Sequence, residues 1–256
     1  MLLRDGKFVK DVDGIYSTSA LGSVKATNAK QLVPEQTIFM CYEDYFSEIS
    51  KNHSIPVMDF EVDRFLSVMP EKALILDIGG CWGWHWRRLA RSRPDVGVLI
   101  IDVSRAHLFE SKNVLGSLVG TQVELLHADA TSLPFLDAEV AMLPFNGIWT
   151  VQVFQHISNY ALAYREAHRV LQVGGKFINY SLHAPPLIRM IYRLAGRCYH
   201  IEGERKNFYL RRADDEQFRV LESIYRGKVS NRYSECLFHP DLKLSFTGRF
   251  DSAIGK

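Results

Sequence analysis

The chain has 256 residues, of which 47% are hydrophobic and 23% charged, and its formal net charge at pH 7 is +2. This length and composition allow one or two domains with a full core, and so small a charge does not by itself indicate nucleic acid binding. No run reaches the about 18 apolar residues of a membrane span, and the charged N-terminus lacks a signal-peptide core, which predicts a cytoplasmic protein. The four cysteines form no C-x-x-C pair, so neither a metal site nor a disulfide frame is expected.

Residues 1–69 precede the part of the chain that carries recognisable motifs. Residues 1–34 are polar and irregular, and short strands are expected only at 7–9 and 14–16. Residues 35–69 predict two helices that are broken near Ile55 and Pro56. We expect 1–69 to form an arm with covering helices, and 70–256 to form the main structural domain.

A glycine-rich turn follows the first strong strand pattern. The apolar run 73–76 is followed by Asp77, and the turn that comes next contains Gly79, Gly80 and Gly83. The dinucleotide pattern G-x-G-x-x-G fails here at two of its three places. A helix is expected to begin at residues 84–91. A turn of this kind can bind a ligand, or it can simply connect a strand to a helix.

Two further apolar runs are each followed by an acid. Residues 96–101 precede Asp102, and residues 123–126 lead to Asp129. Asp102 could bind a ligand, or it could serve as a helix N-cap or turn acid. Leu133 and Phe135, which follow Asp129, could wall a ligand or lie in the core.

A fourth strand is expected at residues 147–153, followed by a helix that ends near Gly174 and Gly175, where permissive backbone favours termination. A fifth strand then runs to Leu182. Two histidines follow these last strands: His156 lies beyond the fourth and His183 beyond the fifth.

The order and spacing of these segments, over residues 73–182, resemble the class I S-adenosylmethionine-dependent methyltransferases, in their small-molecule, type 11-like branch. Asp77, Gly79 and Gly83 match the family motif D-x-G-x-G-x-G, with Cys81 at the middle glycine. The resemblance implies a doubly wound α/β domain with a mostly parallel seven-stranded Rossmann-like sheet, whose ligand lies beyond the carboxyl ends of the strands.

The resemblance also implies S-adenosyl-L-methionine as cofactor. Asp102 would bind the two ribose hydroxyls, Asp129 the adenine amino group, and the amide of Ala130 the adenine ring. The side chain of Cys81 would narrow the room for the methionine end. The full set of implied cofactor-binding residues is Asp77, Gly79, Gly80, Cys81, Gly83, Asp102, Val103, Asp129, Ala130, Val151 and Gln152.

The implied activity is methyl transfer to a small molecule, with oxygen as the expected acceptor atom and nitrogen or carbon as alternatives. His156 and His183 are candidate general bases, although either histidine could instead orient a loop. Tyr42 and Tyr45 are candidates for a substrate lid, although they could instead pack onto the sheet edge. A SAM-binding protein without catalysis is an alternative, and so is a nucleic-acid methyltransferase, but no N-P-P-Y-like tetrapeptide follows the fourth strand.

Residues 184–212 are expected to form a substrate insert that contains a helix at 187–194. Arginines and aromatic residues accumulate in this region, so the substrate could carry phosphate; the same pattern also fits a solvated helix face. A helix is expected at 214–225, and closing strands at 233–238 and 242–247. The sequence does not indicate the oligomeric state.

Overall fold

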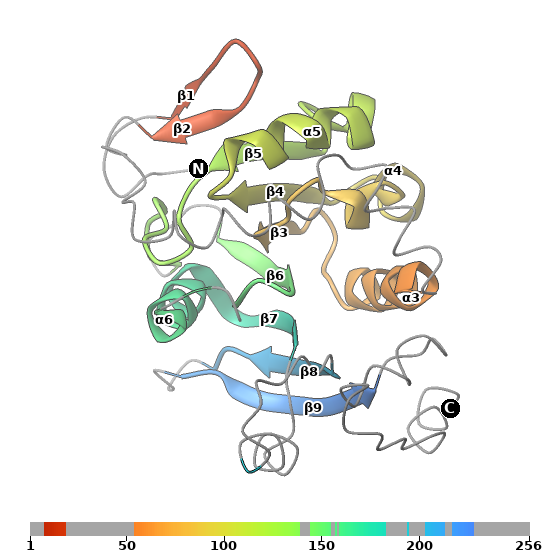
Figure 1. Cartoon of the computed structure of the whole chain (residues 1–256), viewed down its shortest axis with the longest axis vertical. Helices are drawn as coiled ribbons and strands as arrows, with labels where there is room; N and C mark the ends of the chain where they lie inside the picture. Colours follow the sequence, from red (N-terminus) through yellow and green to blue (C-terminus); the bar gives the residue numbers. More distant parts are fainter. Residues whose placement is uncertain are drawn as a thin grey trace.

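A computed structural model describes residues 8–18, 54–138, 144–154, 157, 159–182, 194, 203–212 and 217–227 of the chain. Strands within this part form one sheet in the order β1-β2-β5-β4-β3-β6-β7-β8-β9 (Figure 1). The strands are β1 (Phe8–Lys10), β2 (Tyr16–Thr18), β3 (Leu74–Ile78), β4 (Gly97–Asp102), β5 (Val123–His127), β6 (Phe145–Val151), β7 (Leu171–Leu182), β8 (Gly203–Leu210) and β9 (Arg219–Gly227).

The centre of the sheet is parallel and its margins are antiparallel. Neighbouring strands from β2 to β7 pair in parallel, whereas β1 pairs antiparallel with β2, and β7, β8 and β9 pair antiparallel with one another. Parallel strands require crossover connections, and helices placed on these crossovers cover both faces of the sheet.

Helices pack against both faces of the sheet. They are α3 (Ser54–Ser67), α4 (Leu89–Ser92), α5 (Arg105–Leu115) and α6 (Tyr160–Val170), with short 3₁₀ turns η1 (Trp84–Trp86) and η2 (Gly116–Leu118). Figure 1 shows α6 on one side of the sheet and α3 and α4 on the other.

Two apolar layers follow from this arrangement, because successive strand residues point to opposite faces. Phe65 of α3, Ile75 of β3 and Leu108 of α5 belong to one layer, which we call the α3/α5 layer. Leu76 of β3 and Ala163 of α6 belong to the other, the α6 layer. The adjacent residues 75 and 76 are both fully buried, as expected for a strand that is covered on both sides.

The predicted doubly wound, mostly parallel sheet is confirmed, although the described residues form nine strands where seven were expected in all. The expected strands of the motif-bearing core are all present, and the two short N-terminal strands appear as β1 and β2. The five core strands β3 to β7, the two short strands β1 and β2, and the antiparallel pair β8 and β9 make up these nine. Residues 203–210 of the proposed substrate insert form β8 and so belong to the sheet.

Two local expectations were wrong. Strand β9 occupies much of the region 214–225 where a helix was expected. Helix α6 ends at Val170, and Leu171 is already extended, so Gly174 and Gly175 lie inside β7 and do not end the helix. Helix α3 begins at Ser54, next to the expected break near Ile55 and Pro56, and the helix expected before that break lies outside the described residues.

The helix expected at 84–91 is divided into η1 and α4. The expected strands at 233–238 and 242–247 lie outside the described residues, as does the helix at 187–194 apart from Leu194.

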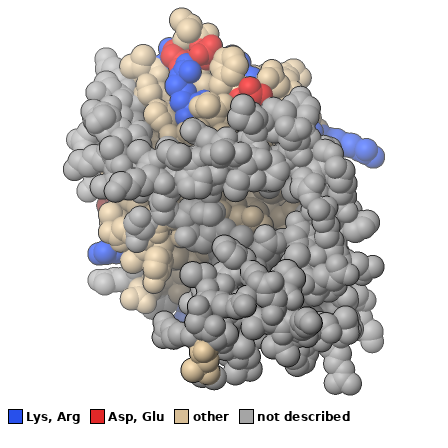
Figure 2. All heavy atoms as spheres, viewed as in Figure 1, with Lys and Arg blue, Asp and Glu red and all other residues tan. Residues whose placement is uncertain are grey.

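Charged side chains fix the N-terminal hairpin to the sheet. Lys10 Nζ lies 3.3 Å from Glu124 Oε2 of β5, and Arg105 Nη2 lies 2.6 Å from Asp11 Oδ2 and also pairs with Asp13. Figure 2 shows acidic and basic side chains side by side at the top of the molecule, where this hairpin and α5 lie. In the described part of the chain, no helix is long and apolar enough to cross a membrane.

Candidate functional site

Three acids lie at the carboxyl ends of three adjacent parallel strands. Asp77 of β3 is the register partner of Ile100 in β4, and Asp102, the last residue of β4, is the partner of His127 in β5. Asp129 follows two residues beyond His127. The sheet therefore brings Asp77, Asp102 and Asp129 to one edge, where doubly wound proteins bind their ligands.

Asp77 is a buried anchor for the turn that follows β3. Its side chain is only 1% exposed, and its Oδ2 accepts a 2.7 Å hydrogen bond from Trp86 Nε1 of η1. Burial raises the pKa of Asp77 to about 7, the Trp86 hydrogen bond opposes this shift, and the negative charge of Asp102 adds to it. Asp77 thus holds η1 in place, and its buried carboxyl group keeps a proton to higher pH than an exposed aspartate does.

Two glycines allow the turn to pass closely over the strand ends. The amide of Gly79 donates to the carbonyl of Ile101 at 2.8 Å, and a Cβ atom at Gly79 would lie 2.6 Å from Val153 Cγ1. A Cβ at Gly80 would lie 2.6 Å from Ile100 Cγ2 and would also clash with the Asp77 carboxylate. Side chains at these positions would force the turn away from the edge.

Cys81 stands where the family motif has glycine, and its backbone is glycine-like. Its φ is 51°, in the left-handed region that residues other than glycine rarely adopt. The amide of Cys81 donates to Asp102 Oδ2 at 3.1 Å. The turn closes two residues later, where the amide of Gly83 donates to the carbonyl of Gly80 at 2.8 Å. The departure from the motif therefore changes the side chain and leaves the backbone shape in place.

Asp102 joins this turn to α5. Besides the Cys81 amide, its carboxylate accepts a 2.7 Å hydrogen bond from the amide of Ser104. Ser104, and not Asp102, is the N-cap of α5, since its Oγ accepts from the amide of His107. Asp102 is therefore a turn acid, as the alternative predicted. His107 Nδ1 also lies 3.7 Å from Asp102 Oδ1. A carboxylate has about four acceptor sites, so Asp102 keeps acceptor capacity for a ligand beyond these contacts.

The loop after β5 places Asp129 and Ala130. Asp129 Oδ1 accepts hydrogen bonds of 2.8 Å from both the amide and the hydroxyl of Thr131, and Ala130 is buried. Val103, beyond β4, is tied to β5 because its carbonyl accepts from His127 Nε2 at 3.0 Å. The loop that follows β4 is thus fixed to the end of β5.

Leu133 and Phe135 are both 2% exposed and belong to the α6 layer, so both are core residues in the described structure. Beyond β6, Gln152 adopts a φ of 59° and its amide donates to the carbonyl of Tyr180 at 2.5 Å, while Val151 is half-buried against the α3/α5 layer. Residues 151 and 152 therefore lie at the same carboxyl edge as the acids.

The candidate bases His156 and His183 and the candidate lid residues Tyr42 and Tyr45 lie outside the described residues. The sequence analysis also missed part of the site. Trp84, His85 and Trp86 are buried directly beside the turn, and Trp149 of β6 packs against them. The signal was present in the string GWHW, in which two tryptophans and a histidine follow the last glycine.

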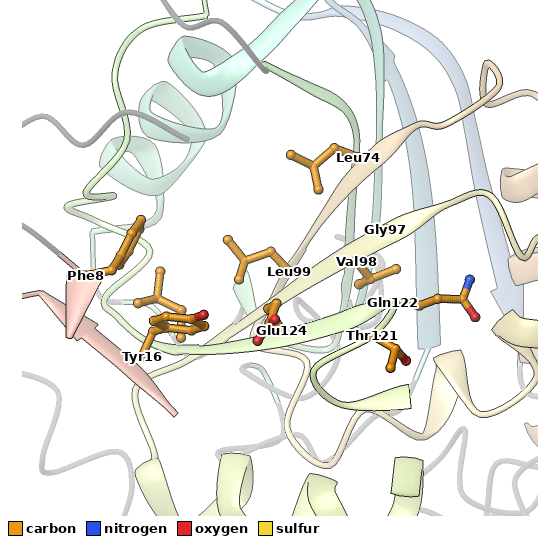
Figure 3. A pocket seen from close by; sticks show the side chains of 10 residues that line it. Phe8, Tyr16, Leu74, Gly97, Val98, Leu99, Thr121, Gln122 and Glu124 are labelled. Atoms are coloured by element: carbon orange, nitrogen blue, oxygen red, sulfur yellow. The ribbon is translucent and has the colours of Figure 1, made fainter. Parts of the chain in front are cut away.

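A separate hollow of about 410 Å³ lies on the α6 side of the sheet. Phe8 and Tyr16 of the hairpin border it, together with Leu74, Leu99 and Gln122 (Figure 3). Its lining includes residues that begin β3 and β4 and precede β5, so it is located toward the amino ends of these strands. It is therefore not part of the edge that carries the three acids.

The residues at the carboxyl edge fit a nucleoside-containing cofactor. Asp102 retains acceptor capacity for a pair of hydroxyls, and the two glycines let the backbone of the turn lie close to the strand ends. Among the described residues, no group of three or more histidine, cysteine or acidic side chains could hold a metal ion.

Comparison with known proteins agrees with this geometry. Residues 76–179 match the family model described as a methyltransferase domain. A malonyl-[acyl-carrier protein] O-methyltransferase from Geobacter sulfurreducens is 24% identical over 188 residues, which cover 71% of this chain and 67% of that protein.

Solved structures give partial matches. An S-adenosylmethionine-dependent methyltransferase from Mesorhizobium loti has 21% identity and a TM-score of 0.38, over 47% of this chain and 52% of that one. The [4+2]-cyclase SpnF has 25% identity and a TM-score of 0.43, over 48% of this chain and 44% of that one. The chain thus spans about half the length of these structures.

The motifs, the sheet order and the family match all fall on the same segment, which contains Asp77, Asp102 and Asp129. Residues 76–179 therefore form a methyltransferase domain of the class I S-adenosylmethionine-dependent family, whose methyl donor is S-adenosyl-L-methionine.

Proposed function

We propose that this protein transfers a methyl group from S-adenosyl-L-methionine to a small-molecule acceptor, at an oxygen atom. The convergence of Asp77, Asp102 and Asp129 on one edge is the observation that carries this proposal, since three strand ends then face a single elongated ligand. The similarity to a malonyl-[acyl-carrier protein] O-methyltransferase supports an oxygen acceptor.

The cofactor, when bound, supplies a methyl group that is already activated by the positive charge of its sulfonium. The main task of the protein is then to hold donor and acceptor close together and in line. We assign Asp102 to the ribose hydroxyls and Asp129 to the adenine amino group, with the Ala130 amide at the ring. Asp77 acts indirectly, because its hydrogen bond to Trp86 fixes the turn that lies beneath the cofactor.

A hydroxyl acceptor must lose its proton during transfer, whereas a carboxylate acceptor has already lost it. His156 follows β6 and His183 follows β7 in the sequence, so both are proposed as bases that could take this proton. We prefer His156 because Gln155 and His156 match the short polar pair that follows this strand in the small-molecule branch. Tyr42 and Tyr45 remain proposed lid residues, and the arginines around residues 189–212 a proposed site for a phosphate-bearing substrate.

Removing the Asp102 carboxylate should weaken cofactor binding. A charge-assisted hydrogen bond is worth about 1.5–3 kcal/mol, so Asp102→Ala should reduce the affinity for S-adenosylhomocysteine by about 10- to 150-fold in calorimetry. Asp102→Asn keeps an acceptor for only one of the Cys81 and Ser104 amides, because these bond different carboxylate oxygens, so it should disturb the turn less than Asp102→Ala does and still lose affinity. Glu124→Gln is the matched control, because it also removes a negative charge but lies away from the carboxyl edge that carries the three acids.

Equal affinity in Asp102→Asn, Asp102→Ala and the unmutated protein would remove Asp102 from the site.

A turnover measurement distinguishes an enzyme from a protein of the same fold that binds S-adenosylmethionine without catalysis. A panel of hydroxyl, carboxyl, amine and carbon acceptors should yield S-adenosylhomocysteine with at least one member. Tight cofactor binding without turnover on any of them would favour the non-catalytic alternative.

A further inference from the structure

His85 is a buried polar residue whose ring makes no hydrogen bond within the described structure. It lies in η1, two residues after Gly83, and is 8% exposed. Its ring centroid is 4.1 Å from that of Trp84 and 5.7 Å from that of Trp149. Within the described structure, neither ring nitrogen of His85 has a hydrogen-bond partner.

Such a residue is costly unless something satisfies it. A buried donor or acceptor without a partner destabilises a protein, and phenylalanine or leucine would fill an aromatic site without that penalty. Burial, assisted by the nearby charge of Arg87, lowers the pKa of His85 to about 3. The ring is therefore neutral at physiological pH and offers one N–H donor and one nitrogen acceptor.

The place of His85 in the fold indicates which group could satisfy it. Trp149, which packs against His85, is the register partner of Asp77, and Trp86 from the same turn bonds the Asp77 carboxylate. The strand order at the edge is β5-β4-β3-β6. A cofactor with adenine near Asp129 after β5 and ribose near Asp102 on β4 must extend its remaining end toward β3 and β6, where His85 lies.

The chemistry of that end matches the surroundings of His85. The remaining end of the cofactor is an α-amino acid with an ammonium group and a carboxylate. A neutral imidazole can donate to the carboxylate and accept from the ammonium group, and indole rings attract a cation that lies over their faces. We propose that His85 binds the amino-acid end of the cofactor, between the rings of Trp84 and Trp149; this assignment rests on the proposed function.

The nitrogens of His85 are closed off in the described structure, so binding requires the surrounding rings to move. The chain contains four tryptophans, and all of them, Trp82, Trp84, Trp86 and Trp149, lie in or beside this turn. Intrinsic tryptophan fluorescence therefore reports on this site alone. We expect S-adenosylhomocysteine to change it more than 5′-methylthioadenosine does, because the latter lacks the amino-acid end.

Calorimetry on the full chain with these two ligands tests the proposal. His85→Phe should lower the affinity for S-adenosylhomocysteine about tenfold and change that for methylthioadenosine less than about twofold. The melting temperature of the free protein should stay the same or rise, because two unsatisfied polar atoms are removed. His85→Gln, which keeps a donor and an acceptor, should recover part of the affinity.

His168→Phe is the matched control, since His168 of α6 also contacts an aromatic ring, that of Phe218 at 5.0 Å, on the other face of the sheet. It should change neither affinity. Equal loss of both ligands in His85→Phe, or no loss of either, would overturn the assignment and leave His85 a structural or water-binding residue. Failure of the unmutated protein to bind either ligand would instead overturn the proposed function.

Discussion

At the scale of single residues, the site depends on a backbone shape that Cys81 adopts at a cost. The left-handed conformation costs a residue with a side chain about 1–2 kcal/mol, whereas glycine loses about 0.5–1 kcal/mol through its greater freedom when unfolded. We predict that Cys81→Gly raises the free energy of unfolding by about 0.5–1 kcal/mol in urea titrations. The hydrogen bond from the residue 81 amide to Asp102 would be retained.

Cys81→Ala separates this backbone effect from loss of the thiol. Alanine keeps a Cβ and hence the strain, so its stability should stay close to that of the unmutated protein. If alanine stabilises as much as glycine does, the thiol is the cause and the backbone argument is wrong. This prediction also bears on the departure from the family motif, because Cys81 keeps the φ of a glycine although its side chain differs.

At the scale of elements, α6 secures the loop that carries Asp129. Arg169 of α6 donates to the carbonyls of Leu133 and Phe135 at 3.0 and 2.6 Å, and it pairs with Glu166 at 2.7 Å. Glu166 Oε2 in turn accepts from the Leu133 amide at 2.8 Å. One arginine and one acid thus satisfy three backbone groups of this loop, at Leu133 and Phe135.

Removing Arg169 should therefore loosen the loop as well as the helix. We expect Arg169→Ala to lower the free energy of unfolding by about 2–3 kcal/mol in urea titrations, because a buried acid and two carbonyls lose their partner. Hydrogen exchange should rise in residues 129–135. Arg165→Ala, on the exposed side of the same helix, is the control and should have little effect. Equal effects of the two variants would show that the network does not hold the loop.

The sequence predicted the elements whose signals are local. Each apolar run that leads to Asp77, Asp102 or Asp129 became a buried parallel strand, because such runs are covered on both faces. The prediction of a helix at 214–225 failed because acids at the start of this region favour a helix locally. The chain is stabilised more by the antiparallel pairing of β9 with β8. The role of Asp77 as an anchor also escaped prediction, since its partner Trp86 becomes visible only when the turn folds back.

At the scale of the whole molecule, the two buried titratable groups of the turn affect stability in opposite directions. The pKa of Asp77 rises from 3.8 to about 7 on folding, so the folded protein holds a proton that the unfolded chain releases, and stability falls as pH rises between about 4 and 7. The pKa of His85 falls from 6.5 to about 3, so the unfolded chain holds the extra proton, and stability rises between about pH 3 and 6.5. Over the shared interval the two contributions partly cancel.

Single variants should separate the two contributions. Asp77→Asn keeps an acceptor for Trp86 Nε1 but cannot titrate, so its stability relative to the unmutated protein should improve as pH rises from about 4 to 7. The stability of His85→Phe relative to the unmutated protein should fall as pH rises from about 3 to 6.5. Over this range only the unmutated protein becomes more stable, because the histidine of its unfolded chain loses its proton. Urea titrations at several pH values measure both differences, in which the other titrating groups cancel. If neither stability difference changes with pH, neither group is buried in the folded protein. The arrangement of Asp77, Trp86 and His85 around the turn would then be wrong.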